Sequence, residues 1–98
     1  MPYTARLKAS LARYLLAAPN PDLRRRIAVL RKTPFPLGSR ALTTDDNWHD
    51  LGESFSDYRA FIYGTNDNAL VYTYDDRTET LSIELAIVQG AVVGGRGP

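Results

Sequence analysis

Apolar positions near the start of the chain recur at the spacing of an α-helix. From Thr4 onwards they fall at Leu7, Leu11, Tyr14 and Leu15, which share one face of a helix with 3.6 residues per turn. Thr4 is a favourable N-cap, and a proline after two consecutive alanines stops the pattern. The sequence therefore predicts a first helix of about 14 residues that begins at Thr4.

A second helix is predicted directly after that proline. Asn20 is a good N-cap, Pro21 suits the first helical position, and Asp22 complements the positive end of the helix dipole. We expect the two helices to form a hairpin whose apolar stripes need a third surface to cover them. The buried stripe of the second helix is expected to consist of Leu23, Ile27 and Leu30.

The second half of the chain has the composition of β-strands. Residues 37–56 keep no sustained period and predict a long ordered loop. Three stretches rich in aromatic and β-branched residues follow at 58–63, 69–74 and 80–89, and the short turns between them force an antiparallel meander. The predicted fold class is α+β, with two N-terminal helices packed on a three- to four-stranded antiparallel sheet.

The stretch 80–89 has the clearest alternation in the sequence. Leu81, Ile83, Leu85 and Ile87 are expected on one face of the strand, because successive side chains point to opposite sides of a sheet. We expect the two helices to cover that apolar face.

Length and composition describe one globular domain. The chain has 98 residues, of which 44% are hydrophobic and 23% charged. We predict a single domain over residues 1–93 and a flexible, glycine-rich tail over 94–98. No apolar run approaches the roughly 20 residues that a bilayer requires, and a signal-peptide core is absent, so a cytoplasmic location is expected. The lack of cysteine excludes disulfides, thiolate metal sites and cysteine nucleophiles.

Charge is distributed unevenly along the chain, although the net charge is only +1. Residues 1–40 hold nine basic side chains and one acid, a net +8, whereas residues 41–98 hold three basic side chains and ten acids, a net −7. Such a split indicates a polyanionic partner, an acidic protein partner, or two halves that neutralise each other in the fold.

The order of elements resembles the RelE/ParE superfamily of small bacterial toxins, which has a short N-terminal strand or extended piece, two helices and an antiparallel meander. The closest resemblance is to the YafQ-like branch, whose second meander strand begins with Asp-Trp and an apolar run ending in Tyr. Here residues 67–72 read Asp-Asn-Ala-Leu-Val-Tyr. The opening Tyr-Thr-Ala-Arg-Leu-Lys of residues 3–8 and the Tyr-Arg pair at 58–59 are also similar to the family.

The resemblance implies RNA cleavage without a metal or cofactor, with the 2′-hydroxyl beside the scissile phosphate as nucleophile. Such a reaction needs a base, an acid for the leaving oxygen and a cation for the phosphorane. His49 is expected to transfer the proton, Asp67 to orient it or to act as a second acid or base, and Arg59 to face the phosphate. Tyr63 completes the candidate catalytic set. The candidate RNA-binding residues are Arg24, Arg25, Arg26, Arg31, Lys32 and Arg40.

The chain departs from the YafQ-like pattern at four positions. Tyr63 stands where the branch has a second histidine, Asn68 replaces the tryptophan, Gln89 replaces the histidine after the last strand, and Val93 replaces the C-terminal aromatic. Glutamine exchanges no proton near neutral pH, and a tyrosine with its free pKa of about 10 is a poor base unless cations lower it. Other branches cut with Lys, Arg and Tyr, and the chain offers Arg40, Arg59, Tyr63, Tyr72 and Arg96.

Each candidate also has a structural interpretation. His49 can pin a loop, and the acids around it have a spacing that fits no standard divalent-metal loop. Trp48 can anchor that loop on the core, the arginines can form a solvated helix face, and the tyrosines can be ordinary strand packing. Two functions therefore stay open. The first is a toxin that cleaves ribosome-bound mRNA and pairs with an acidic antitoxin protein. The second is a non-catalytic RelE/ParE-like module that inhibits or pairs with a protein target.

Overall fold

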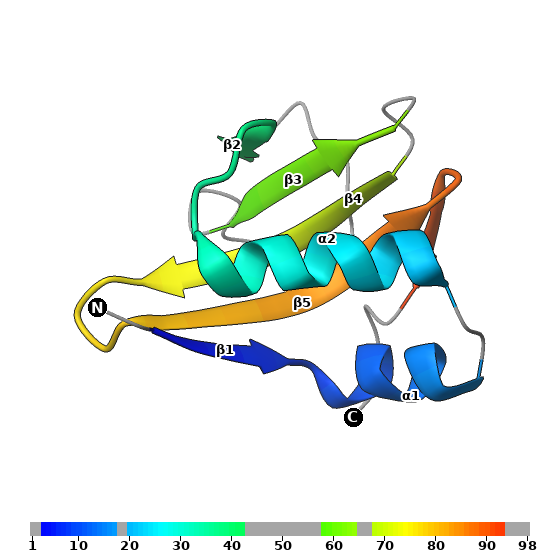
Figure 1. Ribbon diagram of the computed structural model, residues 1–98, viewed down its shortest axis with the longest axis horizontal. Helices are drawn as coiled ribbons and strands as arrows, with labels where there is room; N and C mark the ends of the chain where they lie inside the picture. Colours follow the sequence, from blue (N-terminus) through cyan, green and yellow to red (C-terminus); the bar gives the residue numbers. More distant parts are fainter. Residues whose placement is uncertain (1–2, 18–19, 43–57, 65–67, 94–98) are drawn as a thin grey trace.

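The computed structural model describes residues 3–17, 20–42, 58–64 and 68–93 (Figure 1). Within these residues six strands form one sheet in the order β1–β5–β4–β3–β2, with β6 also paired to β5. β1 runs parallel to β5, and the other pairs are antiparallel. The elements are β1 (Thr4–Leu7), α1 (Ala9–Ala17), α2 (Pro21–Lys32), β2 (Ser39–Ala41), β3 (Arg59–Tyr63), β4 (Asn68–Asp75), β5 (Thr80–Val88) and β6 (Ala91–Val93).

The predicted fold class is confirmed, since two N-terminal helices pack on a mostly antiparallel sheet. The sheet has six strands where three or four were expected, because β1, β2 and β6 are short additions to its edges. Neither helix in the described part of the chain has the length and apolarity needed to cross a bilayer. Residues 94–98 lie outside the described residues, so the predicted flexible tail stays a prediction.

The first helix begins later than the periodicity predicts. Thr4 to Leu7 form β1, because the backbone N–H of Thr4 donates to the carbonyl of Glu79 at 2.9 Å and that of Lys8 donates to the carbonyl of Ile83 at 3.0 Å. These hydrogen bonds to the parallel strand β5 outweigh the helical tendency of the segment. Its side chains also alternate between exposed and half-buried, as in a strand. The extended N-terminal piece implied by the family resemblance is therefore present, whereas the Thr4 N-cap is wrong.

The second helix has the predicted boundaries. Asn20 caps it, with its Oδ1 accepting from the backbone N–H of Leu23 at 3.1 Å, and Pro21 occupies the first turn. At the other end, the Tyr3 hydroxyl donates to the carbonyl of Leu30, and the Tyr72 hydroxyl donates to the carbonyl of Pro34 at 2.6 Å. The end of α2 is thereby fixed to the sheet by two tyrosines.

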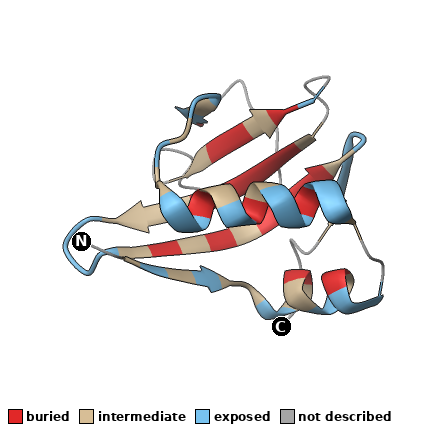
Figure 2. Ribbon diagram, viewed as in Figure 1, coloured by how far each residue is buried: buried red, intermediate tan, exposed pale blue. Residues whose placement is uncertain are grey.

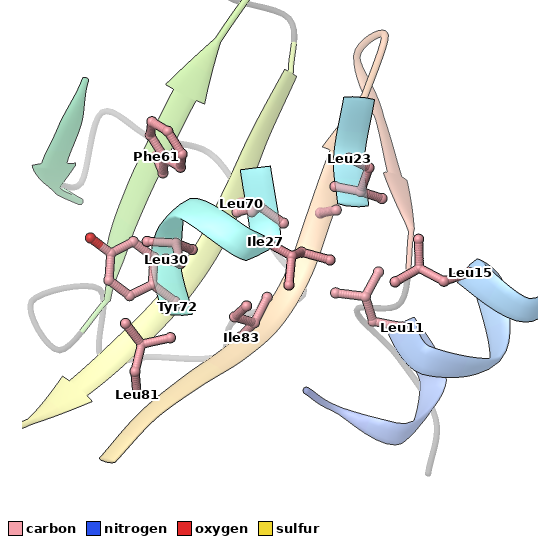
Figure 3. Close-up of a cluster of buried hydrophobic side chains, with 11 residues drawn as sticks. Leu11, Leu15, Leu23, Ile27, Leu30, Phe61, Leu70, Tyr72, Leu81 and Ile83 are labelled. Atoms are coloured by element: carbon pink, nitrogen blue, oxygen red, sulfur yellow. The ribbon is translucent and has the colours of Figure 1, made fainter. Parts of the chain in front are cut away.

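Both helices bury their apolar stripes against one face of the sheet (Figures 2 and 3). Leu23, Ile27 and Leu30 of α2 are buried as predicted, and burial of each such side chain contributes about 1.5–3 kcal/mol. This first core cluster consists of Leu11, Leu15, Leu23, Ile27, Leu30, Phe61, Leu70, Tyr72, Leu81, Ile83 and Ala86. A second cluster on the other face consists of Leu42, Ala60, Ala69, Val71, Leu85 and Ile87.

The predicted face of β5 is wrong in its second half. Val71 pairs with Leu85 while Tyr72 pairs with Ile83, so Glu84 is an extra residue in β5. This bulge reverses the alternation. Leu81 and Ile83 therefore belong to the helix-covered cluster, whereas Leu85 and the next alternate residue, Ile87, belong to the opposite one.

Two further strands were not expected. β2 lies within the stretch 37–56, which was predicted to be a loop, and it pairs with β3 through Ser39 to Ala41. β6 follows β5 across the two-residue turn Gln89-Gly90, where both residues have positive φ, 51° and 82°, as a type I′ hairpin turn requires. A three-residue strand is too short to show an alternating pattern in the sequence, and pairing with a longer neighbouring strand stabilises it.

Candidate functional site

The outer surface of α2 carries most of the predicted RNA-binding cations. Burial of the apolar stripe leaves Arg24, Arg25, Arg31 and Lys32 exposed, while Arg26 is half-buried at the edge of the sheet. Arg31 and Lys32 lie in the last turn, where positive charge is favourable for the helix dipole. Four of the six candidate RNA-binding residues therefore face solvent on this helix.

The partners of these cations are local. Asp22 lies 3.8 Å from Arg25 and 3.7 Å from Arg26, one turn along the same helix. Arg24 Nη2 donates to the carbonyl of Leu15 at 2.8 Å and so ties the end of α1 to α2. The structure places neither Arg31 nor any other exposed α2 cation in an ion pair with an acid from the described residues of the strand half. Within the described part of the chain, the strand half therefore does not neutralise the positive surface of α2.

Tyr63 lies at the end of β3 beneath α2. The guanidinium carbon of Arg26 is 4.9 Å from the centroid of the Tyr63 ring and 6.0 Å from that of Phe61. Burial, together with the charge of Asp22, raises the pKa of Tyr63 above its ordinary value, although Arg26 acts in the opposite direction. Tyr63 is therefore a neutral phenol near pH 7.

Three positions at which the chain departs from the YafQ-like pattern meet at this same end of the sheet. Tyr63 pairs with Asn68 across the β3–β4 hairpin, and the backbone N–H of Gln89 donates to Asn68 Oδ1 at 3.1 Å. None of these side chains titrates near neutral pH as a histidine does. Val93, the fourth position, lies on β6 opposite Ala86.

Arg59 lies at the other end of β3, about 13 Å from Tyr63 along the strand. The structure therefore does not bring these two candidate residues together. Arg59 Nη2 donates to Ser39 Oγ at 3.2 Å, and its guanidinium carbon is 4.8 Å from the centroid of the Phe35 ring. Arg59 Nε is buried and makes no hydrogen bond within the described chain. A guanidinium has five N–H donors, and besides the buried Nε–H and the bond to Ser39 three donors on Nη1 and Nη2 remain for an anion.

Arg59 lines an open pocket of about 570 Å³, which we call the Phe35 pocket. Its lining comes from the loop after α2, the ends of β2 and β4, the start of β3, and the β4–β5 turn. The chemically distinctive members are two aromatic residues, two arginines and two aspartates: Phe35, Tyr74, Arg59, Arg77, Asp75 and Asp76.

One of the aspartates is already engaged. The backbone N–H of Arg77 donates to Asp75 Oδ1 at 2.9 Å, which lowers the pKa of Asp75, and the Arg77 guanidinium lies 3.6 Å away. Asp75 and Arg77 therefore balance each other at the rim of the Phe35 pocket.

The remaining predicted residues are distributed as follows. Arg40 is exposed on β2, where its Nη1 donates to the carbonyl of Ala41 at 3.2 Å. His49, Asp67 and Trp48 lie outside the described residues, so their roles stay predictions. The described residues that flank the segment of His49 are close together, since the backbone N–H of Leu42 donates to the carbonyl of Tyr58 at 3.0 Å.

Sequence reasoning missed the aromatic wall of the Phe35 pocket. The signal was present in the Pro34-Phe35-Pro36 sequence, where the two prolines end the helix and hold a large apolar residue in a short connection. Within the described chain, no cluster of histidine, aspartate and glutamate could hold a metal ion. The acids near His49 lie outside that part.

Neither a protein-family model nor a curated protein matches this chain. Among solved structures, the chain is similar to a chain in the crystal structure of the toxin–antitoxin complex RelBE2 from Mycobacterium tuberculosis. The TM-score is 0.53 at 20% sequence identity, and the likeness covers 95% of this chain and 98% of the other. At this identity the likeness concerns the backbone and does not single out the YafQ-like branch. The chain therefore has a RelE-like α+β fold, with a cationic helix on one side of the sheet and an arginine-containing pocket at its edge.

Proposed function

We propose that this chain is the toxin of a type II toxin–antitoxin pair, and that it binds the ribosome and cleaves mRNA without a metal. The observation that carries the proposal is the exposed cationic surface of α2 on a RelE-like fold. Lysine and arginine side chains that contact phosphates release counterions, and this release drives binding to RNA. The same surface fits an acidic antitoxin segment, which would neutralise it in the inactive pair.

The proposed chemistry is an attack by the 2′-hydroxyl on the adjacent phosphorus. The hydroxyl loses its proton to a base, a cyclic phosphate forms, and the 5′-oxygen leaves with a proton from an acid. We assign Arg59 to the phosphate, because its unused Nη donors can stabilise the charge of the phosphorane. We keep His49 as the base and Asp67 as its orienting residue or as a second acid or base.

The proposed part of Tyr63 is positional. With a raised pKa it is a weak base, but its ring supports the Arg26 guanidinium at the edge of the cationic surface. A hydroxyl that stays protonated can still donate a hydrogen bond to a bound RNA.

A second candidate function is a non-catalytic binding module that inhibits or pairs with a protein target. The observation that favours it is the meeting of Tyr63, Asn68 and Gln89 at one end of the sheet, because none of these three side chains transfers protons near neutral pH. Such a module would use the α2 cations for an acidic protein surface. The binding module predicts a tight complex with a protein target and no cleavage of ribosome-bound mRNA.

The deciding experiment expresses the chain in bacteria and measures growth together with the 5′ ends of ribosome-bound mRNA. Growth arrest with new cuts is expected, and His49→Ala and Arg59→Ala should each abolish both. Arg6→Ala, which removes an exposed cation from β1, serves as the matched control and should stay toxic. Arrest without cuts supports the binding module, and unchanged cutting in both site variants refutes the residue assignment.

The antitoxin partner has its own test. A short neighbouring reading frame that encodes an acidic segment of low hydrophobicity is expected, and its co-expression should restore growth. Charge reversal of Arg31 and Lys32 should weaken that rescue if the segment covers α2.

A further inference from the structure

We propose that the Phe35 pocket binds one nucleotide of single-stranded RNA, with the base against Phe35 and the adjacent phosphate at Arg59. This inference rests on the proposed RNA-directed function and adds a base-binding site to it. In this proposal Phe35 stacks on the base, a contact that the cations of α2 do not make.

The first argument is the exposure of an aromatic ring that is held in place. Phe35 is 54% exposed, yet it lies between two prolines and packs edge-on against Tyr74, with ring centroids 5.5 Å apart. Tyr74 is in turn 5.8 Å from Tyr3 at an angle of 85°. The ring is thus fixed before any ligand arrives, and a rigid exposed aromatic is a stacking surface for a base.

The second argument is the position of Arg59 beside that ring. Its guanidinium carbon is 4.8 Å from the Phe35 centroid, and within the described chain the guanidinium donates only to Ser39 Oγ. A phosphate next to a base that lies on Phe35 would meet the remaining donors. The pair supplies the two contacts that a nucleotide needs, one for its ring and one for its charge.

The third argument is the balance of charge in the Phe35 pocket. Asp75 and Arg77 are paired with each other, which leaves Arg59 opposed by the exposed carboxylate of Asp76. A site with this balance gives little net attraction to a free phosphate. It suits a nucleotide better, since the amino and imino groups of a base can donate to a carboxylate. The volume of about 570 Å³ is also in the range of about 300–1,000 Å³ for small-molecule sites.

The test measures binding of a fluorescein-labelled, single-stranded oligoribonucleotide of mixed sequence by fluorescence anisotropy at low salt. Phe35→Ala and Phe35→Leu should each weaken binding by about 5- to 100-fold, and Phe35→Tyr should retain it, because a stacked base needs an aromatic face. Leu37→Ala is the matched control. Leu37 is 100% exposed two residues further on and does not line the pocket, so its variant should bind as the wild type does. Circular dichroism checks that all variants fold.

Several outcomes would overturn the base-binding site. They are full affinity in Phe35→Leu, equal weakening by Leu37→Ala, and equal competition by a duplex or by an acidic peptide. The proposed toxin function fails separately. If expression causes neither arrest nor cuts but binding still depends on an aromatic residue at position 35, the base site stands alone. If growth arrest and mRNA cuts occur but the Phe35 variants bind the oligoribonucleotide with wild-type affinity, the toxin function stands and the base-binding site is refuted.

Discussion

The guanidinium of Arg26 lies over the ring of Tyr63, 4.9 Å from its centroid, and joins the exposed face of α2 to the buried end of β3. Arg26 is also 3.7 Å from Asp22 on its own helix. The aromatic ring and the carboxylate together hold an arginine that would otherwise extend into solvent. The contact belongs to the ring of Tyr63 rather than to its hydroxyl.

This relationship predicts different effects for two substitutions of Tyr63. Tyr63→Phe keeps the ring and should change the free energy of unfolding by less than about 1 kcal/mol, with growth arrest retained. Tyr63→Ala empties a site in which the side chain is 6% exposed and should cost about 3 kcal/mol or more. Urea unfolding and the growth assay measure both. Loss of toxicity in a well-folded Tyr63→Phe would show that the hydroxyl takes part in the chemistry.

Two tyrosines predict a loss of stability at high pH. The pKa of Tyr3 is raised by burial and by its tyrosine neighbours, and that of Tyr63 by burial and Asp22. A folded pKa above the unfolded value of about 10 stabilises the protein fully below that pH, and the contribution is lost as pH rises through the folded pKa. The free energy of unfolding should therefore be lower at about pH 11 than at about pH 8.

The control for this pH dependence is the double variant Tyr3→Phe/Tyr63→Phe. It should show a smaller decrease, and two late tyrosinate transitions should disappear from its ultraviolet titration. An equally steep decrease in the double variant would assign the effect to other groups.

The hydroxyl of Tyr72 should contribute to stability more than that of Tyr74. Tyr72 is fully buried and donates to the carbonyl of Pro34 at 2.6 Å, so Tyr72→Phe leaves that acceptor without its partner and should cost about 1–2 kcal/mol. Tyr74→Phe keeps the ring contacts with Tyr3 and Phe35 and should stay within about 0.5 kcal/mol of the wild type. Denaturant unfolding compares the two, and equal losses would contradict the anchoring role of Tyr72.

The cations at the end of α2 should determine the salt dependence of RNA binding. Arg31→Ala and Lys32→Ala should each reduce the slope of log K against log salt concentration by about 1. Arg6→Ala removes an exposed cation from β1 and should leave the slope nearly unchanged. Titration of a ribosomal RNA fragment at several salt concentrations measures these slopes. Equal slopes for all three variants would place the RNA elsewhere on the molecule.

Sequence patterns predicted the parts of the fold that local interactions determine. The start of α2 is one such part. Its N-cap Asn20, its first-turn Pro21 and its buried apolar stripe are signals within a single helix, and the structure has all three. β1 and the bulge at Glu84 depend instead on hydrogen bonds to distant strands, which no local period encodes. Thr4 therefore looks like an N-cap in the sequence, although its backbone pairs with β5, a strand near the other end of the chain.

The candidate site shows the same division. The exposed cations of α2 follow from its apolar stripe, and the separation of Arg59 from Tyr63 follows from the predicted strand 58–63. Phe35 was overlooked because an apolar residue between prolines carries no periodic signal. Its neighbours Tyr74 and Arg59 come from strands more than twenty residues away in the sequence.

The turn between β5 and β6 gives the most direct test of the backbone. Gly90 has a φ of +82°, and a Cβ added there would meet no atom within 4 Å, so any cost of substitution is conformational. Gly90→Ala should destabilise the protein by roughly 1–2 kcal/mol, and Gly90→Asn by less, because asparagine tolerates the left-handed region. Gln89 has a φ of 51°. Gln89→Asn should therefore raise the free energy of unfolding by about 0.5 kcal/mol for the same reason.

Urea unfolding measures these three variants, and hydrogen exchange of the Gln89 amide reports on the hairpin itself. That amide donates to Asn68 Oδ1 at 3.1 Å and should exchange faster in Gly90→Ala than in the wild type. Gly90→Ala with wild-type stability would mean that the turn is not of type I′. In the observed register Val88 pairs with Ala91, which leaves Gln89 and Gly90 as a two-residue turn. Because a two-residue turn of this hairpin is of type I′, a different turn would mean a different register between β5 and β6.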